Sequence, residues 1–234
     1  MDKFQNFRSS NESRILAVIP ARGGSKGIVG KNLRRLGPYS LLGLKVMQAR
    51  LSLCDEVYVS TEDAQIEKEA ISCGAKIVQR PSNLAQDDTS TDAVLLHAID
   101  ELGLKDSDVL VLLQATSPFL KSEKIDECIQ KLVNEPSLSS VITIRLGHPF
   151  MWHELDGLIN PVGHSREKRP RRQDLGVEGW ETGGCYAIRV SALRQQRVRY
   201  PQPTAGVSVN QMEALDIDTM EDLELAQKLI EILG

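Results

Sequence analysis

Cysteine is scarce in this chain. The 234 residues include four cysteines, which form no C-x-x-C pair and stand at no zinc-ligand spacing from a histidine. This pattern argues against a structural zinc site and against a disulfide framework. A chain of this length buries about 70% of the surface that its unfolded form exposes, so its core needs no cross-links. We therefore expect Cys54, Cys73, Cys128 and Cys185 to be free thiols in a reducing cytoplasm.

The chain also lacks long apolar runs and an excess of basic residues. No run reaches the about 18 apolar residues of a membrane helix, so we expect no membrane-spanning segment. The net charge is −4, from 28 basic and 32 acidic residues, which argues against a general binder of nucleic acid or of membrane surfaces. Residues 1–13 are polar and lack the apolar core of a signal peptide, so we expect a flexible tail.

Apolar segments that suit buried strands alternate with segments of helical periodicity. The strand-like segments span residues 15–20, 56–60, 75–78, 109–113 and 140–144. The helical segments span residues 40–53, 62–73, 89–102 and 122–134, the last with Ser122 as its expected N-cap. Strand character returns at residues 184–190 and 212–217, before a final helix at residues 218–233. The alternation predicts a Rossmann-like α/β fold, a mostly parallel sheet with helices on both faces.

One region interrupts the alternation. Residues 147–180 hold few aliphatic side chains, and residues 166–172 include five basic side chains. A charge run of this kind is most often a solvated face, and a nucleic-acid patch is disfavoured because the whole chain is acidic. We interpret the region as an inserted arm of a single domain that spans residues 14–234.

A glycine-rich basic loop directly follows the first predicted strand. Its sequence from residue 21 is ARGGSKGIVGKN, in which Arg22, Lys26 and Lys31 are cationic. Adjacent glycines let backbone N–H groups approach phosphate oxygens, and open α/β sheets bind ligands at the carboxyl ends of their strands. The loop matches neither the Walker A pattern nor G-x-G-x-x-G. It is therefore a candidate triphosphate site, and the alternative is a surface turn with scattered basic residues.

Six stretches, in this order, resemble the motifs of the CMP-sialic acid synthetases, also called acylneuraminate cytidylyltransferases. They are IPARGGSKGI..KN from residue 19, RPSNLA from 80, QATSP from 114, RRQD from 171, TGGCY from 182 and DIDT from 216. The resemblance covers nearly the whole chain. It implies a cytoplasmic enzyme in which the anomeric hydroxyl of a nine-carbon 2-keto sugar acid attacks the α-phosphate of CTP. The expected products are a CMP-sugar and pyrophosphate.

The resemblance also assigns roles to single residues. Arg22, Lys26 and Lys31 are the expected catalytic cations, which neutralise charge on the α-phosphate and the leaving pyrophosphate. The expected nucleotide contacts are Ala21, Gly23, Gly24, Ser25, Asn32, Arg80 and Thr91. The expected sugar contacts are Gln114, Thr116, Ser117, Arg172 and Tyr186. Two alternatives stay open, because Thr91 also suits the first turn of a helix and residues 114–117 also suit an ordinary turn.

The arm has a specific role in the family that these motifs resemble. There it crosses a homodimer and brings a cation to the sugar carboxylate in the partner's site, where an arginine binds a carboxylate through two hydrogen bonds. Arg172 matches that position in this chain. The residues leave open whether Arg169, Arg171 or Arg172 faces the site. We therefore expect a homodimer with exchanged arms.

Two acidic residues near the end of the chain suit a divalent cation. Asp216 and Asp218 are spaced i, i+2, which on a strand places both carboxylates on one side. Mg²⁺ prefers oxygen ligands and is usually held by one or two carboxylates together with phosphates. We expect Mg²⁺, or another divalent cation, at this pair, with CTP as co-substrate. The alternative is that Asp218 caps the final helix in a capping box with Glu221.

The sugar itself and three other functions stay open. Thr182 stands where the family has asparagine, and the segment around Arg199 and Tyr200 stands where some sialic-acid enzymes have an aromatic pair. Legionaminic, pseudaminic and deaminated neuraminic acids are therefore alternatives to N-acetylneuraminic acid. A synthetase for the eight-carbon acid KDO is disfavoured by its different loop. A catalytically silent sensor is disfavoured by the charged residues present, and a dinucleotide oxidoreductase by the absence of G-x-G-x-x-G.

Overall fold

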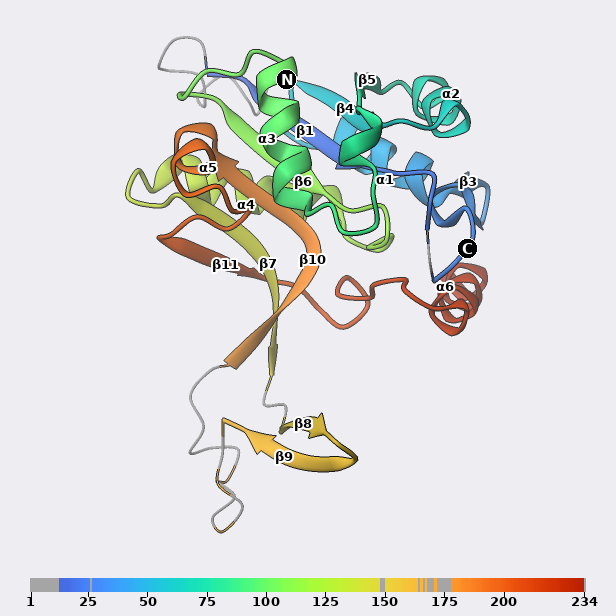
Figure 1. The fold of residues 1–234 in the computed structure, drawn as a ribbon, viewed down its shortest axis with the longest axis vertical. Helices are drawn as coiled ribbons and strands as arrows, with labels where there is room; N and C mark the ends of the chain where they lie inside the picture. The colour runs from blue at the N-terminus through green and yellow to red at the C-terminus, as the bar shows by residue number, and fades with distance from the viewer. Residues whose placement is uncertain are drawn as a thin grey trace.

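Strand β1 (Ile15–Pro20) runs through a seven-stranded sheet in the computed structural model of the chain. The structure describes residues 13–25, 27–147, 150–163, 165, 167, 171 and 178–233. On one side of β1 lie β4 (Glu56–Thr61) and then β5 (Lys76–Gln79), and on the other lies β6 (Val109–Leu113). These strands are all parallel, so their carboxyl ends meet at one edge of the sheet (Figure 1).

The sheet continues beyond β6 with a strand that runs the other way. Strand β10 (Glu178–Arg189) pairs antiparallel with β6 and with β7 (Ser140–Gly147). Strand β11 (Thr204–Ser208) then pairs parallel with β7, and the order is β11-β7-β10-β6-β1-β4-β5. The prediction of a mostly parallel sheet is thus confirmed.

Helices bury both faces of this sheet. Along β1, Ala17 and Ile19 pack into one apolar cluster while Leu16 and Val18 pack into another, because successive side chains point to opposite faces. The first cluster takes residues from α1 (Leu41–Arg50), α2 (Ala64–Ser72), α4 (Ser122–Asn134) and α6 (Met220–Leu233). The second takes residues from α3 (Thr91–Glu101) and α5 (Val190–Gln196). Continuous apolar runs such as VLVLL in β6 follow from this double burial.

Helices α1, α2 and α3 each begin after a residue whose side chain caps them, and α4 does not. Ser40, Asp63 and Ser90 cap α1, α2 and α3, each accepting a hydrogen bond from a backbone N–H of the first turn. The predicted helix at residues 122–134 is confirmed as α4, but the predicted N-cap was wrong. Its N-cap is Lys121, which makes no side-chain cap, and Ser122 is the first helical residue.

The prediction of a strand at residues 212–217 was also wrong. The segment forms a turn and then irregular backbone, and the edge strand is β11 instead. Asn210 explains the turn, because its side-chain oxygen accepts hydrogen bonds from Met212 N at 2.9 Å and Glu213 N at 3.0 Å. Glu213 Oε2 in turn accepts a hydrogen bond from Asn210 N at 3.0 Å.

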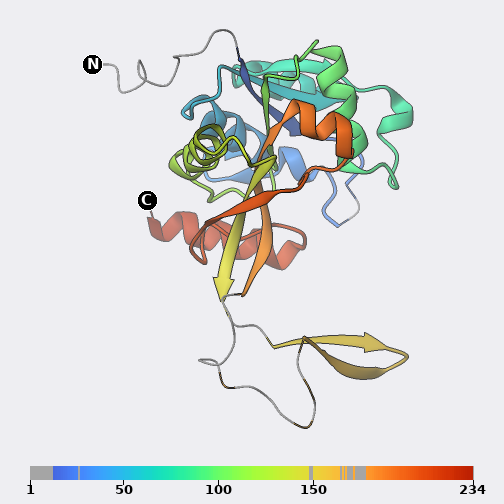
Figure 2. The ribbon, with the colours of Figure 1, turned by 90° about the vertical axis from the view of Figure 1, so that its left-hand side faces the viewer.

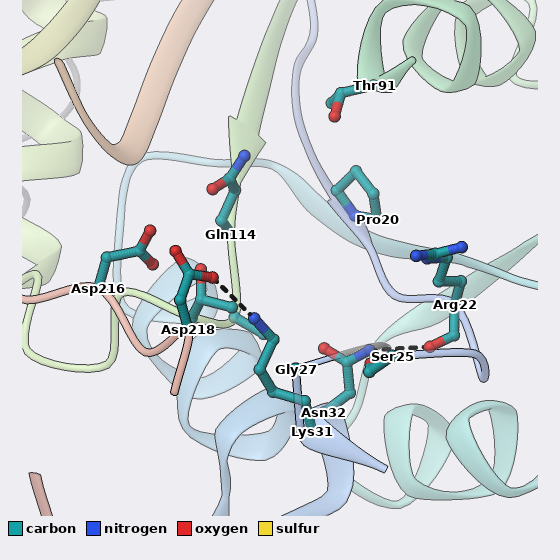
Figure 3. A pocket seen from close by; sticks show the side chains of 12 residues that line it. Pro20, Arg22, Ser25, Gly27, Lys31, Asn32, Thr91, Gln114, Asp216 and Asp218 are labelled. Carbon is teal, nitrogen blue, oxygen red and sulfur yellow. Dashed lines mark hydrogen bonds and ion pairs between the residues drawn. The ribbon is translucent and has the colours of Figure 1, made fainter. Parts of the chain in front are cut away.

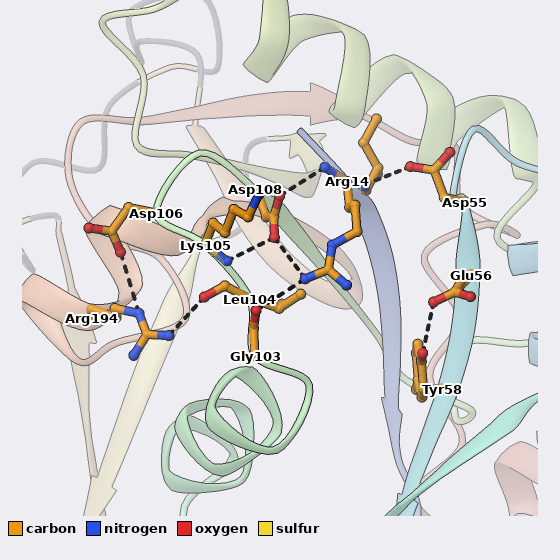
Figure 4. Close-up of polar contacts among 11 residues, drawn as sticks. Arg14, Asp55, Glu56, Tyr58, Gly103, Leu104, Lys105, Asp106, Asp108 and Arg194 are labelled. Atoms are coloured by element: carbon orange, nitrogen blue, oxygen red, sulfur yellow. Dashed lines mark hydrogen bonds and ion pairs between the residues drawn. The ribbon is translucent and has the colours of Figure 1, made fainter. Parts of the chain in front are cut away.

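A polar network closes the sheet at the amino ends of β1 and β6 (Figure 4). The buried Asp108 carboxylate accepts hydrogen bonds from Arg14 N at 2.9 Å, Arg14 Nη2 at 3.2 Å and Lys105 N at 2.8 Å. Asp55 Oδ2 accepts one from Ile15 N at 2.9 Å. This network lies at the opposite end of the strands from the pocket described below, so it supports the fold rather than a site.

Strands β7 and β10 extend beyond the rest of the sheet toward a small hairpin (Figures 1 and 2). Strand β8 (Met151–Leu155) pairs antiparallel with β9 (Leu158–Val162) through a turn at Asp156 and Gly157. Both turn residues have positive φ angles of 52° and 77°, as a two-residue hairpin turn requires. The two strands lie within the predicted arm, and most of their residues are exposed.

Two absences expected from the sequence can be compared with the structure. All four cysteines are free, with Cys128 and Cys185 buried. In the ranges that the structure describes, no helix combines the length and the apolar character needed to cross a membrane.

Three short elements complete the fold near the first helix: the 3₁₀ turn η2 (Lys31–Leu33) and the strands β2 (Arg35–Leu36) and β3 (Tyr39–Ser40). A second 3₁₀ turn, η3 (Ser82–Leu84), follows β5.

Candidate active site

A pocket of about 450 Å³ opens at the carboxyl ends of β1 and β6. From β1 the chain builds the sheet outward through β4 and β5, and it then returns to add β6 on the other side. This is the topological switch point at which open α/β sheets bind ligands. The lining residues are Pro20, Arg22, Ser25, Gly27, Lys31, Asn32, Thr91, Gln114, Ala115, Thr116, Asp216 and Asp218. They come from four separate stretches of the chain, which only the fold brings together.

The loop after β1 forms one wall of the pocket, and hydrogen bonds fix its shape. Asn32 Nδ2 donates to Arg22 O at 3.1 Å, which ties the start of the loop to its end. Arg22 Nη1 donates to Asp87 Oδ1 at 2.6 Å, linking the loop to the segment that precedes α3. Gly23 N donates to Glu62 Oε1 at 2.8 Å. A cation and a backbone N–H of the loop therefore each have an acidic partner in this structure.

Lys31 joins this loop to the acidic segment on the opposite wall (Figure 3). Its Nζ donates to Ile217 O at 2.9 Å and to Asp218 Oδ1 at 3.0 Å. Gly27 approaches the same segment so closely that a Cβ atom there would lie 2.5 Å from Asp218 O. Only glycine permits this approach, because real Cβ atoms do not come within 3.0 Å of a backbone oxygen.

The two acidic residues differ strongly in environment. Burial raises the pKa of the Asp216 carboxyl, a hydrogen bond with the Thr116 side chain opposes that rise, and the nearby Asp218 charge adds to it. Asp216 Oδ1 is buried and has no hydrogen-bond partner. The Asp218 side chain is 73% exposed and is held by Lys31. Asp216 therefore offers a buried oxygen that accepts no hydrogen bond, and Asp218 offers an exposed carboxylate at the pocket rim.

This donor set fits a hard divalent cation only in part. Two carboxylates supply oxygen ligands, and the unpartnered Asp216 Oδ1 is one of them. Within the described residues, no group of three or more His, Cys, Asp or Glu side chains converges on a metal position. A cation here would need further oxygen ligands from a bound phosphate group or from water.

The alternative role of Asp218 as a helix cap was wrong. Thr219 and Asp222 form the reciprocal pair that begins α6: Thr219 Oγ1 accepts from Asp222 N at 3.2 Å, and Asp222 Oδ2 accepts from Thr219 N at 2.8 Å. The Asp218 side chain is therefore left for the pocket. Neither aspartate lies on a strand, so the side that they share comes from the irregular backbone and not from strand alternation.

The turn after β6 supplies another side of the pocket. Gln114, Ala115 and Thr116 line it, and Thr116 O accepts a hydrogen bond from Ile217 N at 2.8 Å, which links the turn to the acidic segment. Gly183 lies behind Gln114 with a φ angle of 72°, and a Cβ atom there would lie 2.9 Å from Gln114 Oε1. Figure 3 shows Gln114, Asp216 and Asp218 on one side of the pocket and Arg22 and Thr91 on the other.

The predicted site residues thus fall into three groups. In the pocket lie Arg22, Ser25, Lys31, Asn32, Thr91, Gln114, Thr116, Asp216 and Asp218. Outside its lining lie Ala21, Gly23, Gly24, Arg80, Ser117 and Tyr186. Lys26 and Arg172 lie outside the described residues, as does Arg169. The sequence did not single out Pro20, Gly27 or Ala115, although all three stand within the quoted motifs and that position was the available signal.

Three of the residues outside the lining are buried, and two of them have hydrogen-bond partners for their side chains. Arg80 donates to Ser60 Oγ at 3.1 Å and to Ser60 O at 2.6 Å, and burial lowers the pKa of its guanidinium. Tyr186 lies on the sheet face covered by α3 and α5, and its hydroxyl donates to Glu181. Ser117 is fully buried behind the turn. These side chains hold the walls of the pocket in this structure and do not face its interior.

Comparisons with known proteins bear on the whole chain. Residues 16–153 match the family model described as Cytidylyltransferase. The chain is 36% identical over 184 residues to N-acylneuraminate cytidylyltransferase B of Danio rerio, across 76% of this chain and 42% of that protein. It is 34% identical over 234 residues to CMP-N,N'-diacetyllegionaminic acid synthase of Legionella pneumophila, across 94% of this chain and 97% of that protein.

The fold has solved relatives as well. The structure of CMP:2-keto-3-deoxy-manno-octonic acid synthetase complexed with CTP aligns with a TM-score of 0.70, covering 95% of this chain and 100% of that one. Its sequence identity is 19%, so the likeness shows the fold. The chain spans about half the length of the Danio rerio relatives that it matches, 42% of one and 50% of the other.

Proposed function

This chain belongs to the cytidylyltransferase family, and we propose that it transfers the cytidylyl group of CTP to a nine-carbon 2-keto sugar acid. In the proposed step the anomeric hydroxyl oxygen bonds to the α-phosphorus while the bond from that phosphorus to the bridging oxygen of the β-phosphate breaks. Pyrophosphate leaves, a CMP-sugar forms, and the hydroxyl proton is released. The observation that carries the proposal is the pocket at the switch point, where cations of one loop face two carboxylates.

The cations suit the triphosphate of the proposed substrate. Arg22 and Lys31 stand on the loop that follows β1, and both line the pocket. Nucleotidyl transfer depends mainly on positioning and on stabilising the charge of the phosphates, so fixed cations at this place lower its barrier. Lys26 belongs to the same proposal by its place in the loop sequence. Ser25 and Asn32 from the same loop, and Thr91 from the start of α3, would contact the nucleotide.

Asp216 and Asp218 would hold a divalent cation, which we propose to be Mg²⁺. When bound, such an ion neutralises phosphate charge and orients the α-phosphate. Asp216 offers a buried oxygen without a partner, and Asp218 offers an exposed one. Lys31 contacts Asp218, so the loop cation and the acidic pair are aligned before substrate binds.

The turn after β6 would receive the sugar acid. Gln114 and Thr116 present an amide and a hydroxyl to the pocket, groups that suit the hydroxyls and acyl-amino groups of such a sugar. The Danio rerio relative is named for N-acylneuraminate and the Legionella pneumophila relative for N,N'-diacetyllegionaminic acid. Both names support a nine-carbon acid for this chain and leave several such acids as candidates.

We also propose that the chain works in the cytoplasm as a homodimer with exchanged arms. An isolated two-stranded hairpin is marginally stable in water, yet β8 and β9 expose apolar side chains, among them Leu155 at 61% and Leu158 at 70%. A second copy of the chain would cover these side chains, and its arm would bring Arg172 to the sugar carboxylate. The four free cysteines support a reducing compartment.

The experiment that tests the proposed function is a pyrophosphate-release assay. The chain is incubated with CTP, Mg²⁺ and, in turn, N-acetylneuraminic, legionaminic, pseudaminic and deaminated neuraminic acids and KDO. Asp218→Ala is assayed beside Glu221→Ala, a control that removes an exposed carboxylate next to the pocket. Release with one nine-carbon acid that is lost only in Asp218→Ala supports the proposal. CTP binding without release favours a silent sensor, and no CTP binding refutes the assignment.

A further inference from the structure

Helix α1 carries a lysine in the interior of the protein. Lys45 is 0% exposed and lies among the buried apolar residues of the helix, which are Leu41, Leu42, Val46 and Ala49. Lysine is almost never fully buried without a partner, because an ammonium group loses its hydration there. Burial lowers the pKa of Lys45 to about 7, although the nearby Cys185 and Asp216 oppose the change. Neither the motifs nor the pocket lining includes this residue.

The side chain of Lys45 ends at the turn that follows β6. Its Nζ donates to Ser117 O at 2.8 Å. One helical turn later, Gln48 Nε2 donates to Pro118 O at 2.6 Å. Residues three apart share a helix face, so α1 holds two successive carbonyls of the turn with two adjacent side chains. The turn is thereby anchored by two side chains of α1 that do not line the pocket.

The anchored turn is the one that carries the pocket residues Gln114 and Thr116. It is also joined to the acidic segment, because Thr116 O accepts from Ile217 N at 2.8 Å. Buried oxygens without partners lie on this turn and on its neighbours: Ser117 Oγ, Asp216 Oδ1 and Gln48 Oε1. The polar layer around Lys45 is therefore incompletely satisfied, which is unfavourable for stability.

A purely structural role does not account for a lysine at this position. Ser117 O also accepts a hydrogen bond from Leu120 N at 3.4 Å, so the carbonyl keeps a partner without Lys45. An apolar side chain of similar length would fill the same space without burying an ammonium group, whose loss of hydration is unfavourable. The buried lysine therefore costs stability that an apolar side chain would not, and such a cost is typical of a group that serves a site.

We propose that Lys45 is a positioning residue, which holds the Ser117 carbonyl so that Gln114 and Thr116 face the sugar acid. This inference rests on the proposed function, because it assigns the turn to the sugar. The loop that carries Arg22 and Lys31 has no contact with Lys45 in the hydrogen bonds of the described residues. The positioning therefore concerns the acceptor substrate, and the nearby Asp216 charge links Lys45 to the proposed cation site.

The test replaces Lys45 with Met, which keeps the length of the side chain and removes the donor and the charge. We expect the KM for the sugar to rise, and kcat/KM for the sugar to fall, by about 10- to 100-fold, as a small misplacement of substrate groups produces. The dissociation constant and the stoichiometry of CTP binding, measured without a divalent cation so that the Asp216 site is not involved, should stay within about twofold, and the melting temperature should stay equal or rise. A folding defect gives the opposite pattern, with less CTP bound and an unchanged KM for the sugar.

Two further variants and one structural readout complete the test. Gln48→Leu is the matched control: it removes the contact with Pro118, one residue farther along the chain from Gln114 and Thr116, and should change kcat/KM less than Lys45→Met. Lys45→Gln is too short to reach Ser117 O and should behave like Lys45→Met, which keeps the test decisive if the Met variant does not fold. Amide hydrogen exchange over residues 114–120 should accelerate in Lys45→Met, while exchange over β4 stays unchanged.

The outcomes separate this inference from the proposed function. If the unaltered chain releases no pyrophosphate with any sugar acid, the proposed function fails, and hydrogen exchange still decides whether Lys45 anchors the turn. Unchanged exchange over residues 114–120 overturns the positioning role, whatever the activity. Faster exchange with an unchanged KM and kcat for the sugar overturns it too, because the turn then does not place the substrate. Faster exchange with a raised KM for the sugar supports it.

Discussion

The ion pair between Arg22 and Asp87 gives a prediction that runs against the usual effect of a substitution near a site. Arg22 Nη1 lies 2.6 Å from Asp87 Oδ1 across the pocket rim. A triphosphate that binds Arg22 must compete with this carboxylate, and the carboxylate also repels the phosphates. Asp87→Asn removes the negative charge and keeps the shape of the side chain. We therefore expect the variant to bind CTP more tightly than the unaltered chain.

The size of the gain follows from the exposure of the pair. The side chains of Arg22 and Asp87 are 28% and 52% exposed, so solvent screens their attraction. Exposed ion pairs contribute about 0.2–1 kcal/mol. Releasing that amount to nucleotide binding lowers the dissociation constant of CTP by about 1.4- to 5-fold. Because the interaction is screened by ions, the gain should shrink as the salt concentration rises.

The assay is calorimetric titration of CTP at low and at high salt. Asp88→Asn is the matched control, since it makes the same change in net charge one residue away and Arg22 pairs with Asp87. An equal gain in both variants would show that only the net charge matters. Weaker CTP binding in Asp87→Asn would refute the competition and would show that Asp87 instead orients Arg22 toward the phosphates.

Three other predictions concern the walls of the pocket, the buried lysine and the arm. Gly27→Ala places a Cβ 2.5 Å from Asp218 O and should cost about 1–3 kcal/mol in stability and alignment, whereas Gly24→Ala, with open space around it, should change the melting temperature little. The pKa of Lys45 is about 7 in the folded protein and ordinarily 10.5. Between pH 7 and pH 10.5 the unfolded chain therefore binds more protons than the folded one, so the free energy of unfolding rises with pH in this range. The stability advantage of Lys45→Met should accordingly be largest below pH 7 and shrink toward pH 10, as thermal melts can show. Leu158→Asp should convert the proposed homodimer to a monomer in sedimentation velocity and leave the melting of the main sheet unchanged; a dimer that persists would refute the role of the hairpin.

Strands that are buried on both faces could be predicted from the sequence, whereas segments with weak or misleading sequence patterns could not. The runs ILAVIP and VLVLL are apolar throughout because both of their faces meet helices, and the sequence placed both strands correctly. Strand β11, with the sequence TAGVS, carries small residues and gives little signal. The segment 212–217, MEALDI, holds four apolar residues and two acidic ones, a composition that resembles a strand, but the side-chain hydrogen bonds of Asn210 bend it into a turn.

Residues of the candidate site could be predicted from the sequence where the position of the backbone determines whether a residue reaches the pocket. They were harder to predict where the direction of the side chain determines it. Residues of the loop after β1 and of the turn after β6 reach the pocket because parallel strands bring their carboxyl ends together. Tyr186 lies on β10, where alternation places its side chain on one of two faces, and in the structure it joins the α3 and α5 side. Lys45 interrupts an apolar helix stripe, a signal in the sequence that became interpretable only once the fold set the helix behind the turn.

The contacts around the loop after β1 indicate how the loop keeps its shape while its cations can still bind a phosphate. Arg22 donates a hydrogen bond to Asp87, Gly23 N to Glu62 and Lys31 to Asp218, so each of these donors has a carboxylate partner. All three carboxylates belong to exposed residues, so water can solvate them when a ligand takes their place. A triphosphate would replace one anion by another, which costs less than ordering a loop whose cations repel each other. Asp218, once released by Lys31, would be free to join Asp216 as an oxygen donor, and nucleotide binding would thereby promote cation binding at the same wall.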